Sequence, residues 1–164
     1  MKKQTSSSNT YSAALNRTSE SFDNDVYALV AATAQLQEVA LTKSEYKIVP
    51  SLFWDLEKGE SSLNSKYHGE AMGSHFDSGS GIIAGGYKWI AEIKTGRKLA
   101  LALRADYMLV YSGLEAQPEE YVQLYFRKLA RFTTYPYFRA LFATSTSLSN
   151  IPLPPLPTLI DRVD

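Results

Sequence analysis

The chain has 164 residues, of which 17 are Lys or Arg, 17 are Asp or Glu and 45% are hydrophobic. A chain of this length buries roughly 70% of its unfolded surface, so a single domain is the simplest organisation. The balanced charge argues against a nucleic-acid-binding protein, which usually carries a basic excess. The absence of cysteine excludes disulfides and thiolate metal sites.

The N-terminal region, residues 1–20, is rich in Ser, Thr and Asn. We expect it to be a flexible leader ahead of one domain at 21–164. It has no apolar run typical of a signal peptide, and no stretch of the chain approaches the roughly 20 apolar residues of a membrane span. A cytoplasmic protein without membrane insertion is therefore expected. Asp23 or Asn24 is suited to cap one or two helical turns within 22–32.

Residues 34–49 are predicted to form a strand with one irregularity. Val39 and Leu41 occupy odd positions, whereas Tyr46 and Ile48 occupy even positions. One extra residue near Lys43-Ser44, as in a β-bulge, returns both halves to the same face of a sheet.

The connection at 50–64 carries a cluster of large apolar side chains near its start, which are Leu52, Phe53, Trp54 and Leu56. Connections rarely expose such a cluster without a reason. Two interpretations remain open. The side chains either pack beneath the connection as a small satellite core, or they flank a binding groove.

A weak strand is predicted over 66–77, followed by a turn at 78–81. Two strong strands come next. Apolar residues share one face of the first strand and occupy every second position of the second. Thr95-Gly96-Arg97 between them is a tight-turn signal, so we predict an antiparallel hairpin. The apolar positions are Ile83, Tyr87, Trp89, Ala91 and Ile93 in the first strand, and Leu99, Leu101, Leu103, Ala105, Tyr107, Leu109 and Tyr111 in the second.

Two helices are predicted after the hairpin. The first begins at 117–120, where proline and acidic residues suit a first turn, and Thr133-Thr134 is predicted to end it. The second begins at Tyr135-Pro136 and ends before the proline run at 152–157. Strands followed by helices predict an α+β fold with the helices on one face of the sheet. In the first helix the predicted apolar face is Tyr121, Leu124, Tyr125 and Leu129, with Val122 and Phe126 widening it. In the second helix the apolar positions are Phe138, Leu141, Phe142 and Leu148.

No catalytic or metal-binding set stands out. His68 and His75 point to opposite faces of a strand. The run 79–84 fits a loose dinucleotide fingerprint, but the residues after it alternate like a strand. The chain contains 11 Tyr, 7 Phe and 2 Trp. Most of these are expected in the core, and the remainder suits a broad apolar binding surface. We expect a non-enzyme without a cofactor or a metal.

The segment Tyr135-Pro136-Tyr137-Phe138-Arg139 resembles the aromatic-Pro-Tyr-x-Arg opening of the long helix in the SecB family of protein-export chaperones. After the helix comes Ile151-Pro152-Leu153-Pro154-Pro155-Leu156. The first strand, the Phe53-Trp54 connection and the hairpin also match, so the resemblance covers 34–157. The sequence ends at Asp164, without the family's second C-terminal helix or its acidic C-terminal tail.

The resemblance implies a four-stranded antiparallel sheet with two helices packed on one face, assembled as a dimer or tetramer. It implies a chaperone (holdase) that binds unfolded polypeptide clients in an apolar groove, with the SecA motor or an antitoxin as further partners. The missing tail weakens the expectation of SecA docking. A structural oligomer or an adaptor for one partner stays open as the alternative. The substrate-binding residues implied are Leu52, Phe53, Trp54, Tyr137, Phe138 and Phe142.

Overall fold

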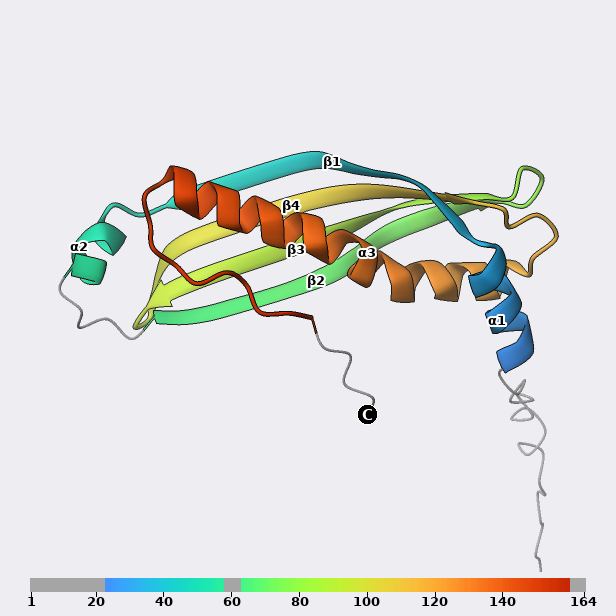
Figure 1. Ribbon diagram of the computed structural model, residues 1–164, viewed down its shortest axis with the longest axis horizontal. Coiled ribbons are helices and arrows are strands. Elements are labelled where there is room, and N and C mark those ends of the chain that lie inside the picture. Colours follow the sequence, from blue (N-terminus) through green and yellow to red (C-terminus); the bar gives the residue numbers. More distant parts are fainter. Residues whose placement is uncertain (1–22, 58–62, 160–164) are drawn as a thin grey trace, which may run out of the picture.

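Residues 23–57 and 63–159 are described by a computed structural model (Figure 1). The predicted leader at 1–20 lies outside the described residues, so the division into leader and domain stays a prediction. In chain order the elements are α1 (Asn24–Thr33), β1 (Gln35–Ile48), α2 (Ser51–Glu57), β2 (Leu63–Asp77), β3 (Ile82–Thr95), β4 (Lys98–Ser112) and α3 (Glu119–Leu148).

The four strands form one antiparallel sheet in the order β1-β4-β3-β2. Helix α3 lies across one face of this sheet and packs mainly on β2 and β3, and α1 packs against α3 (Figure 1). The predicted α+β class, with helices on one face of a four-stranded antiparallel sheet, is confirmed. Within the described ranges, no helix has the length and apolar character needed to span a membrane.

The irregularity predicted in the first strand is confirmed. The register of β1 on β4 shifts between Leu41 and Lys43. The extra residue is Thr42, whose hydroxyl donates a hydrogen bond to the carbonyl oxygen of Asp106 at 3.0 Å. The shift keeps the apolar side chains before and after it on the helix-covered face. A second shift, between Leu36 and Glu38, was not predicted.

The β3–β4 hairpin also forms as predicted. Thr95 pairs with Lys98 across a two-residue turn, and Gly96 has a φ of 60°, which glycine adopts without steric cost. The predicted apolar side chains of both strands are buried except that of Leu99, which is half-buried. A register shift that was not predicted pairs Leu99 with Lys94 and leaves Ala100, which is buried, without a partner in β3.

The predicted break at Thr133-Thr134 is wrong, because α3 continues through it as one helix of 30 residues. Proline removes one intrahelical hydrogen bond and can bend a helix without ending it. Helix α3, with Pro136 inside it, is bent near its middle (Figure 1). Buried side chains on both sides of the bend, Phe126 and Phe138 among them, hold the two halves on the sheet. This packing outweighs the local preference for a break.

The centre of the buried face of the first helical segment also differs from the prediction. Tyr125 is buried as expected, but Tyr121, Leu124 and Leu129 are only half-buried. Val122 and Phe126, which were predicted only to widen the face, are fully buried together with Ala130. The face is rotated by about one residue, because contact with the sheet and not average hydrophobicity decides which side turns inward.

Thr134 links α3 to the sheet through a buried hydrogen bond. The indole Nε1–H of Trp89 donates to Thr134 Oγ1 at 2.7 Å, and this hydroxyl donates to the carbonyl oxygen of Ala130 at 2.6 Å. Both side chains are almost fully buried. The contact therefore fixes the bent middle of α3 over β3.

Thr134→Val is expected to lower the free energy of unfolding by about 1–3 kcal/mol, because the isosteric change leaves the buried indole N–H without an acceptor. Urea denaturation measures the loss. Thr144→Val is the matched control, because Thr144 is an exposed threonine of the same helix. Equal midpoints for the two variants would contradict the assigned role of Thr134.

Candidate functional site

Helix α2 separates the four apolar residues of the connection into an inner and an outer set. Consecutive helical residues lie about 100° apart, so a run of apolar residues cannot all face the core. Leu52 is fully buried and Leu56 packs against the core, whereas Phe53 is 40% exposed and Trp54 is 64% exposed. Leu52 and Leu56 therefore agree with the interpretation as a satellite core, whereas the binding role of Phe53 and Trp54 stays a prediction.

The aromatic residues of the second half of α3 divide in the same way. Phe138 and Phe142 are buried, and the Phe138 ring stacks on Trp89 with centroids 5.6 Å apart. Tyr137 is 52% exposed. Of the six predicted substrate-binding residues, Phe53, Trp54 and Tyr137 offer surface to a client, and the other three lie in the core. Their role in client binding stays a prediction.

The exposed residues lie apart along the molecule. Helix α2 lies at the end of the sheet toward which the C-terminal half of α3 points (Figure 1). Tyr137 is near the middle of α3, roughly 16 Å along the helix axis from its last residue. A ligand that contacts both α2 and Tyr137 must therefore span at least that distance.

The C-terminal strap, residues 149–159, is a further feature of this face. Ile151 and Leu156 are buried in the core, and Leu153 and Leu159 pack against it. Periodicity did not identify these anchors, because an extended proline-rich segment has no fixed inward side. Their signal is the presence of aliphatic residues between prolines.

Tyr135 connects the strap to the sheet. Its hydroxyl donates a hydrogen bond to the carbonyl oxygen of Pro157. Its ring contacts Trp89, with centroids 4.9 Å apart, and Tyr67, with centroids 5.8 Å apart. Burial raises the pKa of Tyr135 to about 12. The tyrosine therefore stays neutral and able to donate at any ordinary pH.

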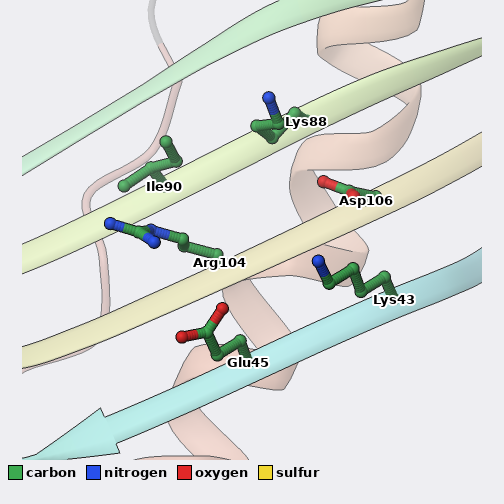
Figure 2. A pocket seen from close by; sticks show the side chains of 6 residues that line it. All are labelled: Lys43, Glu45, Lys88, Ile90, Arg104 and Asp106. Carbon is green, nitrogen blue, oxygen red and sulfur yellow. The ribbon is translucent and has the colours of Figure 1, made fainter.

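The opposite face of the sheet carries a shallow depression (Figure 2). Charges of both signs line it, and the Nζ atom of Lys88 lies 3.0 Å from Oε1 of Glu70. The hydrogen bond from Lys88 lowers the pKa of the Glu70 carboxyl. The lining residues, from β1, β3 and β4, are Lys43, Glu45, Lys88, Ile90, Arg104 and Asp106.

The histidines and acidic residues of the described part of the chain do not gather into a metal-binding set. His68 and His75 are both exposed, and no group of three or more His, Asp or Glu side chains is placed to hold a metal ion there. The run 79–84 belongs to the β2–β3 turn and to β3, without the helix that a dinucleotide site needs. The arrangement therefore offers apolar surface and mixed charge.

Among known proteins, the chain is similar to a SecB-like chaperone of Mycobacterium tuberculosis, whose structure was solved in complex with a peptide from an antitoxin. The two share 18% sequence identity with a TM-score of 0.67, over 85% of this chain and 99% of the other. A protein of unknown function from Streptococcus agalactiae shows 12% identity and a TM-score of 0.39, over 77% and 97% of the two chains. No family model and no curated protein matches the sequence.

The chain has the SecB-like fold, and the resemblance predicted from the sequence is confirmed at that level. The likeness extends over almost the whole length of the mycobacterial protein. An identity of 18% leaves the function to be argued from the surface of this chain.

Proposed function

We propose that this protein is a non-enzymatic, ATP-independent molecular chaperone (holdase) of the cytoplasm that binds unfolded polypeptides. The observation that carries the proposal is the exposure of Phe53 and Trp54 on α2 in a chain with the SecB-like fold. Two adjacent aromatic side chains on this short helix expose apolar surface to water, and this exposure costs about 25 cal/mol of free energy per Å². An apolar client removes this cost when it binds.

The separation between α2 and Tyr137 supports an extended client. An extended chain rises about 3.3 Å per residue, so about five residues are needed to span the roughly 16 Å between Tyr137 and the end of α3. A folded protein rarely presents such a segment with its apolar side chains free. Several weak apolar contacts along one segment also give useful affinity while binding stays reversible.

Trp54→Ala is expected to weaken binding of a chemically unfolded client by about tenfold or more, because large aromatic side chains dominate the binding energy of such surfaces. Suppression of client aggregation, followed by light scattering, measures the loss. The far-UV circular dichroism of the variant should match that of the wild type, because Trp54 is 64% exposed.

Met72→Ala is the matched control, because Met72 is 51% exposed on β2 and should leave client binding unchanged. Trp54→Phe should retain most of the activity, since it keeps an aromatic ring. Full holdase activity of Trp54→Ala would remove Trp54 from the client surface.

A narrower function is that of a dedicated chaperone for an antitoxin. The mycobacterial SecB-like chaperone was solved in complex with an antitoxin peptide, which favours this candidate. A peptide array separates the alternatives. Binding to many unrelated apolar peptides supports a general holdase, binding to one sequence supports a dedicated chaperone, and binding to none supports an adaptor or structural oligomer. A binding assay with purified SecA tests the export role.

We also propose that the chain forms a homo-oligomer, a dimer or tetramer, through the edge strand β1. Leu36 and Leu41 of this strand are each 46% exposed, and one edge of β1 has no neighbouring strand in the sheet. An unpaired strand edge with apolar residues is a template for pairing with another chain. Light scattering of the purified protein gives the oligomeric state.

A further inference from the structure

We propose that the C-terminal strap, residues 149–159, occupies a seat for an extended client segment, and that a client binds there by displacing the strap. The inference rests on the proposed holdase function and names the class of segment that the surface accepts. That segment is an extended, uncharged stretch with Ile or Leu at the spacing of Ile151, Leu153 and Leu156.

The path of the strap defines the seat. Pro157 accepts a hydrogen bond from Tyr135, so the strap returns along the second half of α3 (Figure 1). The helix from residue 135 to residue 149 is roughly 21 Å long, and eight residues of nearly extended chain cover about that distance. The strap therefore lies as an extended peptide beside α3 on the helix-covered face.

Side chains hold the strap in this position. Ile151 and Leu156 are each only 4% exposed. Leu153 and Leu159 pack against the same core. Aromatic rings from β2, β3 and α3 meet beside Tyr135, which suits bulky aliphatic side chains and disfavours charged ones.

The backbone of the strap is weakly held. Four of its residues are prolines, which have no N–H to donate. In the described part of the chain, four backbone N–H groups of the strap donate hydrogen bonds, and all four bonds are local. Those of Ser149, Asn150 and Ile151 donate to carbonyl groups of the last turn of α3, at 3.0–3.2 Å. The Leu153 N–H donates to Ile151 O at 2.8 Å. None of these bonds joins the strap to the sheet.

A client segment can therefore replace what the strap supplies. Its aliphatic side chains would fill the positions of Ile151 and Leu156, and one of its carbonyl groups would accept the hydrogen bond from Tyr135. Ordinary residues in place of proline would also bring N–H donors that the strap lacks. A client can bind only to molecules in which the strap is not seated. The apparent affinity for clients is therefore the intrinsic affinity multiplied by the fraction of such molecules.

The test compares Leu156→Ser with Leu148→Ser, which makes the same change at a side chain that is 82% exposed. A labelled peptide of residues 150–159 and a reduced, carboxymethylated α-lactalbumin serve as probes. We expect Leu156→Ser to bind both probes about tenfold more tightly than the wild type. This is the gain expected if the strap is seated in about nine of ten wild-type molecules and is released in the variant. Leu148→Ser should bind like the wild type.

A spin label reports the strap itself. The chain contains no cysteine, so Pro154→Cys provides a single attachment point at an exposed strap position. We expect the label to gain mobility when the unfolded client is added. This measurement uses the intact strap and therefore decides the question even if Leu156→Ser does not fold.

The outcomes separate the inference from the proposed function. Client binding with an immobile label, or unchanged affinity in a folded Leu156→Ser variant, overturns the displaced strap and leaves the holdase intact. No client binding by the wild type or by either leucine variant overturns both. A mobile label together with tighter binding in Leu156→Ser supports both.

Discussion

Phe138→Ala is expected to lower the free energy of unfolding by about 3–5 kcal/mol. The Phe138 side chain is fully buried and its ring stacks on Trp89 at an interplanar angle of 14°. Truncation leaves a cavity at the bent middle of α3. The helix already lacks one backbone hydrogen bond there, because Pro136 has no N–H to donate. Urea denaturation followed by tryptophan fluorescence measures the change.

The adjacent residue is the matched control. Tyr137→Ala should change the free energy of unfolding by no more than about 0.5 kcal/mol, because Tyr137 is 52% exposed. Its expected effect is on client binding instead. A Phe138→Ala variant that keeps its stability and loses client binding would instead place Phe138 on the client surface, as the family resemblance implied.

The sheet was predictable because its signals are local. In β3 and β4 the apolar residues recur at every second position, and Gly96 allows the turn between them. The phase change between Leu41 and Tyr46 likewise located the bulge within two residues. A pattern read along one strand does not say which strand lies beside it, so the pairing of β1 with β4 was not predicted.

The errors in the helical region have a tertiary cause. Thr133, Thr134 and Pro136 are each poor helix formers, and together they favour a break. The structure compensates for them through contacts that no local window contains. The Tyr111 hydroxyl lies 2.7 Å from Thr133 Oγ1, and the Trp89 indole donates to Thr134. Both partners come from the sheet, at least 22 residues earlier in the chain.

The candidate site was predicted as a set of residue types but not as a surface. The sequence marks Leu52, Phe53 and Trp54 as an unusual apolar run, and helix α2 then turns one inward and two outward. The division depends on the angle at which this short helix meets the core. The strap could not be placed for a similar reason, because the contact between Tyr135 and Pro157 joins residues 22 positions apart.

Raising the pH from about 9 to about 12 is expected to destabilise the fold by about 2–4 kcal/mol, through buried tyrosines. Burial raises the pKa values of Tyr107 and Tyr135 from the ordinary 10.0 to about 12. Burial also raises the pKa values of Tyr87, Tyr111 and Tyr125. The hydroxyl groups thus hold their protons in the folded chain at pH values where the unfolded chain has released them.

The direction of the effect follows from proton binding. Below about pH 10 both states are protonated at these tyrosines, so their contribution to stability is complete and constant. Between about pH 10 and 12 the unfolded chain binds fewer protons than the folded chain, and stability falls as the pH rises. Urea midpoints measured at several pH values across this window give the slope of stability against pH.

Tyr107→Phe keeps the ring and removes one titrating hydroxyl, so its slope of stability against pH should be shallower than that of the wild type. Identical slopes for the two proteins would show that Tyr107 ionises equally easily in the folded and unfolded chains.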